Sequence, residues 1–149
     1  MHLRKFSLLV LLLSVAELAQ AEGFRLANQE GRMTEYSGML TLTGRFERRQ
    51  DAETLVWRGD RVCFWPDAEF LDQLPGNKKS DERFFCFSNH TGSLAKLKLP
   101  SLPPQGSCGM AGKAKVVISR YVVERGNAFD QAWLDRAEDV GAPTLLPCP

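Results

Sequence analysis

The sequence is poor in histidine and has no clear excess of either charge. It contains two histidines and has a formal net charge of +1 at pH 7. Subtracting Arg4, Lys5 and Glu17, the charged residues of the first 21 positions, from 19 basic and 18 acidic residues leaves 17 of each. Nucleic-acid-binding domains usually show a clear basic excess, and so do proteins held at membrane surfaces by polybasic segments. We therefore expect no nucleic acid and no charged membrane surface among the partners.

Long hydrophobic runs are also absent after the amino terminus. The one such run, "FSLLVLLLSVA" at residues 6–16, follows a positively charged start and precedes the small residues "AQA" at 19–21. It is too short for a stable membrane anchor, which needs about 20 apolar residues. The pattern predicts a signal peptide over residues 1–21 and an exported, periplasmic or secreted, single domain over 22–149. An uncleaved anchor is the alternative.

Recognisable catalytic motifs are missing. After residue 21 the sole histidine is His90, so a Ser-His-Asp or Cys-His mechanism would depend on it. The sequence has neither a G-x-S-x-G motif nor a P-loop. Asp67, Glu69 and Asp72 are clustered, but they do not have the spacing of an EF-hand loop and suit a solvated connection. We expect a protein that is not an enzyme, with no cofactor and no metal, and keep a hydrolase using His90 or these carboxylates as an alternative.

Four cysteines are present after residue 21: Cys63, Cys86, Cys108 and Cys148. The nearest two are 22 residues apart, whereas structural zinc sites use close pairs such as C-x2-C. In an oxidising compartment two disulfides are expected. The runs "RVCFWP" and "RFFCFS" both have a strand-like pattern, and as antiparallel neighbours they would place Cys63 opposite Cys86. Of the three possible pairings we favour Cys63–Cys86 with Cys108–Cys148.

Period-2 patterns predict most of the secondary structure. Residues 36–48 alternate, with Leu40, Leu42 and Phe46 on one face, and two glycines suggest a curved strand. Residues 112–125 form the strongest predicted strand, with Ala114, Val116 and Ile118 on one face and Lys115, Val117, Ser119 and Tyr121 on the other. A short helix is expected near residues 89–99. Residues 127–141 predict an amphipathic helix with Asn127 as N-cap and Gly141 as its stop.

This order of elements resembles the OB-fold, a small Greek-key barrel with a helix between its third and fourth strands. The phrases "GDRVCFWP", "FCFSN" and "CGMAGKAKVVISRY" are also similar to those of small exported bacterial proteins without an assigned role. The resemblance implies a mainly β domain: a closed or partly open antiparallel β-barrel with a short internal helix and a C-terminal helix. A β-sandwich is the alternative.

Tryptophans and arginines gather on the second and third predicted strands, the face with which OB-folds commonly bind oligonucleotides or oligosaccharides. The candidate binding residues are Trp57, Arg58, Arg61, Trp65 and Arg83. Tryptophan and arginine dominate binding hot spots. We therefore predict that this protein binds a protein partner and acts as an inhibitor or immunity-type factor. An oligosaccharide or cell-wall binding module is the alternative. The structural interpretation is that the tryptophans pack as core beneath the last helix.

Overall fold

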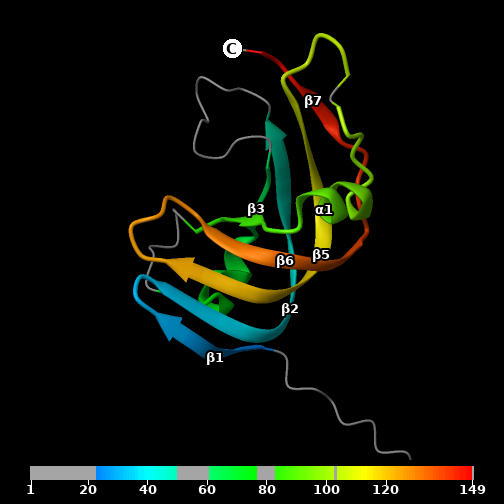
Figure 1. Ribbon diagram of the computed structural model, residues 1–149. Helices are drawn as coiled ribbons and strands as arrows, with labels where there is room; N and C mark the ends of the chain where they lie inside the picture. Colours follow the sequence, from blue (N-terminus) through cyan, green and yellow to red (C-terminus); the bar gives the residue numbers. More distant parts are fainter. Residues whose placement is uncertain (1–22, 50–60, 77–82, 103, 149) are drawn as a thin grey trace, which may run out of the picture.

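A computed structural model describes residues 23–49, 61–76, 83–102 and 104–148, and it is mainly β. One seven-stranded sheet has the order β1-β2-β3-β4-β6-β5-β7, with a further pairing of β2 to β5 (Figure 1). The strands are β1 (Gly23–Glu30), β2 (Met33–Arg49), β3 (Val62–Pro66), β4 (Phe85–Phe87), β5 (Gly109–Glu124), β6 (Asp130–Glu138) and β7 (Thr144–Leu146). The helices are η1 (Ala68–Gln73), a 3-10 helix, and α1 (His90–Lys96).

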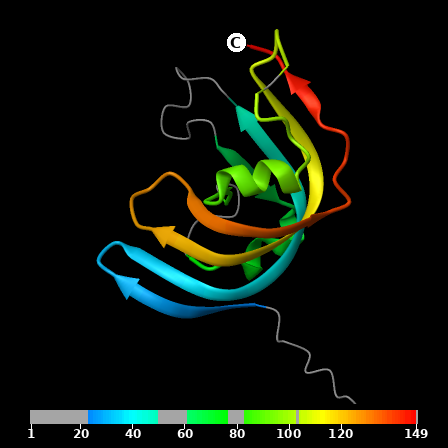
Figure 2. The same cartoon turned by 45° about the vertical axis from the view of Figure 1, so that its right-hand side comes forward.

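Five of the strands close into a ring because β2 is long enough to pair with two neighbours. It pairs with β5 along almost its whole length and with β3 over residues 44–48. The ring therefore runs β2, β3, β4, β6, β5 and back to β2, and α1 follows its third strand. The predicted mainly β fold and its short internal helix are confirmed. Figure 2 shows the β1–β2 hairpin and β7 at opposite ends of the molecule.

The core fills the inside of this ring. Leu40, Leu42 and Phe46 of β2 are buried, as their alternation predicted, and Leu94 and Leu97 of the α1 segment join the same cluster. Burying one such side chain stabilises the fold by roughly 1.5–3 kcal/mol.

Two glycines make room for the aromatic rings of this core. A Cβ atom on Gly112 would lie 2.6 Å from the Phe46 ring, and one on Gly44 would lie 2.8 Å from the Phe64 ring. A side chain at either position would therefore displace a buried phenylalanine.

The prediction of a C-terminal helix over residues 127–141 is wrong, because this segment contains β6. Alternate residues Asp130, Ala132 and Leu134 are buried there, as in a strand. A register shift then separates the buried Leu134 from the half-buried Ala137, three residues later, which is a spacing typical of a helix. Asn127 is not an N-cap: it lies in a turn, where its backbone N–H donates to the Glu124 carbonyl at 3.1 Å.

Strand β6 also corrects the expectation of an antiparallel sheet. It pairs antiparallel with β5 but parallel with β4. The ladder to β4 is extended by Asn89, whose side-chain amide donates to the Leu134 carbonyl at 2.9 Å and whose amide oxygen accepts from the Leu134 N–H at 3.0 Å. The direction of pairing is decided by the connection through α1 and β5, which single-strand patterns do not report.

A bulge in β5 overturns the predicted orientation of Tyr121. Residues 114, 116 and 118 point into the core as predicted, but the register with β6 shifts between Ser119 and Tyr121. At this shift Arg120 adopts a positive φ of 47°, uncommon for a residue with a side chain. The extra residue turns Tyr121 inward, so that it is buried instead of sharing a face with Lys115 and Val117.

Three further elements differ from or extend the sequence prediction. The segment expected to be a polar connection forms η1, and β1 was not predicted. The carboxy-terminal tail adds β7 to the edge of β5, with Cys108–Cys148 beside it. Both predicted disulfides, Cys63–Cys86 and Cys108–Cys148, are confirmed. They suit an oxidising environment.

Within the described ranges, no helix has the length and apolar character needed to cross a membrane. The predicted signal peptide, residues 1–21, lies outside the described residues.

Candidate functional site: an aromatic and arginine face

Four side chains line up across the outside of the ring, and we call them the outer aromatic row: Arg45, Trp65, Phe84 and Phe129. Arg45 of β2 is the register partner of Trp65 of β3. Phe84 and Phe129 come immediately before Phe85 and Asp130, which are paired with each other across β4 and β6. Because each residue occupies the matching position on its strand, the four side chains stand side by side.

The row is a continuous stack. The Arg45 guanidinium carbon lies 5.0 Å from the Trp65 ring centroid. Trp65 and Phe84 are stacked at 4.9 Å with an interplanar angle of 13°, and Phe84 and Phe129 are 6.4 Å apart. Cation–π and offset aromatic contacts of this kind each contribute about 0.5–1.5 kcal/mol. Trp65 thus has two neighbours within the row, the Arg45 guanidinium and the Phe84 ring.

The Cys63–Cys86 disulfide lies next to the row and belongs to the same small cluster. Both cysteines are about 1% exposed, Phe129 is 2% exposed, and Trp65 and Phe84 pack against them half-buried. Arg61 completes the far side, with its guanidinium carbon 5.4 Å from the Phe129 ring centroid. A covalent bond between β3 and β4 therefore fixes the strands that present the row.

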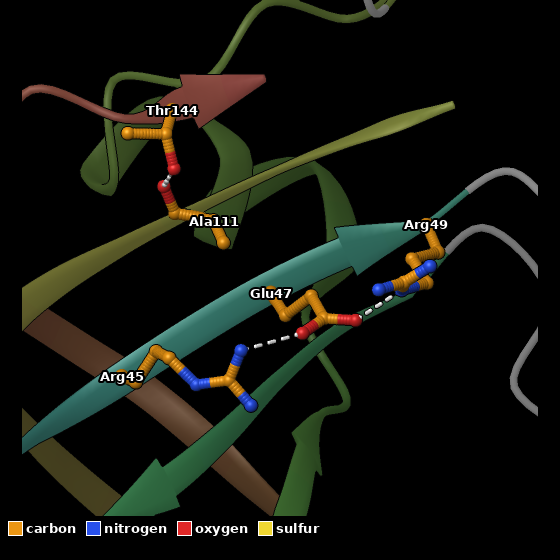
Figure 3. Close-up of polar contacts among 5 residues, drawn as sticks. All are labelled: Arg45, Glu47, Arg49, Ala111 and Thr144. Atoms are coloured by element: carbon orange, nitrogen blue, oxygen red, sulfur yellow. Dashed lines mark hydrogen bonds and ion pairs between the residues drawn. The ribbon is translucent and has the colours of Figure 1, made fainter. Parts of the chain in front are cut away.

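An ion-pair ladder on β2 holds the other end of the row (Figure 3). Glu47 accepts a hydrogen bond from Arg45 at 2.8 Å and another from Arg49, and its side chain is only 8% exposed. The two guanidinium groups compensate the cost of burying this carboxylate.

In the same view the Thr144 hydroxyl donates to the Ala111 carbonyl at 3.2 Å, which ties β7 to β5.

A small hollow adjoins the row where β3, β4, β6 and α1 meet. Its volume is about 260 Å³, and its lining residues are Arg61, Cys86, Phe87, Ser88, His90 and Gln131. The described part of the lining contains one guanidinium, one imidazole, one amide and one hydroxyl, and no carboxylate.

The structure brings some of the predicted binding residues together and not others. Arg61 and Trp65 both lie on the aromatic face. Arg83 lies elsewhere: its guanidinium donates to the carbonyls of the segment after η1, at 2.9 Å to Leu74 and 2.7 Å to Gly76. Trp57 and Arg58 fall outside the described residues.

Sequence reasoning missed Arg45, Phe84 and Phe129 as members of this face. Alternation does place Phe84 on the same face as Cys86, so this signal was present in the sequence. Phe129 was hidden by the assignment of its segment to a helix. Arg45 could be found only from the register between β2 and β3.

The alternative catalytic residues are not assembled into a metal site. Within the described part of the chain, no group of three or more His, Cys, Asp and Glu side chains is placed to hold a metal ion. Asp67, Glu69 and Asp72 are exposed at η1, where Asp67 accepts from the Thr43 hydroxyl at 2.6 Å. His90 is half-buried at the start of α1.

One buried polar pair lies inside the ring. The Tyr121 hydroxyl donates to the Asp130 carboxylate at 2.9 Å. Burial, together with the charge of Asp130 and this hydrogen bond, raises the pKa of Tyr121 well above its usual value of 10.0. The Tyr121 hydroxyl therefore gives the buried Asp130 carboxylate a hydrogen-bond donor, and the pair joins β6 to the last part of β5.

Comparisons of the chain with protein-family models, curated proteins and solved structures gave no match.

Proposed function

We propose that this chain is a small exported, periplasmic or secreted, non-enzymatic protein that binds another protein through the outer aromatic row, as an inhibitor or immunity-type factor does. The observation that supports this most strongly is the row of Arg45, Trp65 and Phe84, which packs against the buried Phe129 beside a disulfide. Aromatic residues and arginines provide most hot-spot energy in protein interfaces. A face held by a cross-strand disulfide loses little conformational entropy on binding, which favours affinity.

The packing of Trp65 favours a protein over a sugar at this row. Nucleic-acid bases stack on the open face of an aromatic ring, and a pyranose ring needs the same open face. Both sides of Trp65 already have neighbours, Arg45 and Phe84. The row therefore offers ring edges and guanidinium groups, which suit polar and apolar side chains of a partner.

The test is native copurification from the cells that produce the protein, comparing variants at exposed arginines. The double variant Arg45→Ala/Arg61→Ala removes the two cations at the ends of the row. Arg136→Ala is the matched control, because Arg136 is 60% exposed and lies on β6 outside the row. We expect a partner protein to copurify with the wild type and the control and to be lost with the double variant. A partner retained equally by all three proteins would rule out this face.

An oligosaccharide ligand is the second candidate, and Trp133 of β6 favours it. Its side chain is 42% exposed, and within the described residues it has no aromatic or cation–π contact. Adding cell-wall glycans should then change tryptophan fluorescence in the wild type but not in Trp133→Phe. An unchanged spectrum with every glycan would eliminate this candidate.

A further inference from the structure

We infer that the hollow between Arg61, Ser88, His90 and Gln131 is a carboxylate pocket that receives an Asp or Glu side chain of the partner. This rests on the proposed protein-binding function and names the chemistry of the residue that the partner inserts. The pocket adjoins the outer aromatic row, because Arg61 contacts Phe129 of the row and also lines the hollow.

The lining selects for negative charge. Arg61 is exposed, and within the described residues its guanidinium has a ring contact with Phe129 but no ion pair. This differs from Arg45 and Arg49, which are both paired with Glu47. An arginine fork matches a carboxylate with two parallel hydrogen bonds. Among the described residues that line the hollow, none is acidic and could compete for this guanidinium.

A second donor points to the same ligand. The Gln131 side-chain amide lines the hollow and makes no hydrogen bond to any other described residue. The Ser88 hydroxyl instead donates to the Ala132 carbonyl at 3.2 Å, which leaves its oxygen without a proton to offer. Arg61, which comes just before β3, and Gln131 of β6 therefore supply the donors.

The size of the hollow fits one side chain. Its volume of about 260 Å³ is smaller than the roughly 300–1,000 Å³ typical of small-molecule sites. An acidic side chain from a protein docked on the row would enter it without requiring a deeper cleft.

The experiment is an NMR titration of the purified, disulfide-bonded protein with N-acetyl-glutamate methylamide, observing the Arg61 Nε–H and Gln131 amide signals. N-acetyl-glutamine methylamide, which has the same shape without the charge, is the matched ligand. We expect saturable shifts of both signals with the glutamate compound and at least about tenfold weaker binding of the glutamine compound, because hydrogen bonds to a charged group are stronger than those between neutral groups.

Variants localise the effect, and the dispersion of each spectrum reports whether the variant is folded. Binding should fall at least about tenfold in Arg61→Ala and weaken in Gln131→Ala, while Arg136→Ala keeps the wild-type affinity. Equal binding of both compounds, unchanged binding in Arg61→Ala, or displacement by inorganic phosphate at equal concentration would each overturn the carboxylate assignment. The titration uses no partner, so its failure would leave the copurification result standing, and the converse also holds.

Discussion

At the scale of single residues, the arginines of this chain have separate roles that their sequence positions do not reveal. Arg48 is 1% exposed and donates to the carbonyls of Pro100 and Ser101 at 2.5 and 2.6 Å. Arg136, in contrast, is exposed and paired with Glu138 at the surface. Buried charge-assisted hydrogen bonds contribute far more to stability than exposed ion pairs.

Arg48→Met should therefore lower the free energy of unfolding by about 2–4 kcal/mol, because it leaves two carbonyls of the loop after α1 without their donors. Arg136→Ala should change it by no more than about 0.5 kcal/mol. Urea unfolding of the three proteins measures both values. Equal stabilities for Arg48→Met and the wild type would show that the loop does not depend on the hydrogen bonds from Arg48.

The buried Tyr121 predicts a loss of stability at alkaline pH. Below pH 10 its hydroxyl is protonated in both states, so its contribution is constant; above pH 10 the unfolded chain loses this proton while the folded protein retains it. The free energy of unfolding should then fall with a contribution from Tyr121 of about 1.4 kcal/mol per pH unit.

Tyr121→Phe removes this titration and should show a correspondingly shallower decline between pH 10 and 11. It should also be less stable at neutral pH by about 1–3 kcal/mol, because the Asp130 carboxylate loses a buried donor. Denaturant titrations at several pH values measure both effects. Parallel pH curves for the two proteins would contradict the assigned protonation.

At the scale of elements, local patterns predicted the strands that keep a constant alternation and failed where a bulge interrupts it. The core-facing residues 40, 42 and 46 of β2 and 114, 116 and 118 of β5 keep a constant alternation, and they were predicted correctly. Strand β6 pairs with β5 across two register shifts, so its apolar residues acquire a spacing typical of a helix. At Arg120 the alternation of inward and outward side chains shifts by one residue. This shift depends on the positive φ of Arg120, which no sequence pattern predicts.

The two disulfides should stabilise different parts of the molecule. Cys63–Cys86 joins β3 and β4, two adjacent strands of the ring. Replacing both cysteines by alanine should lower the free energy of unfolding by about 3 kcal/mol. Cys108–Cys148 lies beside β7, a three-residue strand whose described pairing is with β5. Removing it should mainly open this edge locally.

Hydrogen exchange distinguishes these outcomes. Without Cys108–Cys148, the amides of β7 should exchange much faster while those of β3 and β4 keep their protection. Without Cys63–Cys86, protection should fall throughout the ring. Uniform loss of protection in both variants would mean that β7 and the ring open together.

At the scale of the whole molecule, the sequence predicted the disulfide pairing and the mainly β architecture because both follow from strand patterns and cysteine spacing. Of the proposed binding face, the sequence predicted only Arg61 and Trp65. Its other members are brought together by the register of four strands, one of which runs parallel to its neighbour. Such long-range pairing is not a property of any one segment.

The most direct test of the proposed binding face is site-specific photo-crosslinking in the cells that produce the protein. A photoreactive amino acid replaces Ser88 in one protein and Arg136 in the other, so that both probes are exposed but only one lines the hollow beside the outer aromatic row, with Arg61 kept in place. We predict a discrete protein adduct from position 88 and none from position 136. An adduct of equal yield at both positions, or from position 136 alone, would contradict the assignment of this face.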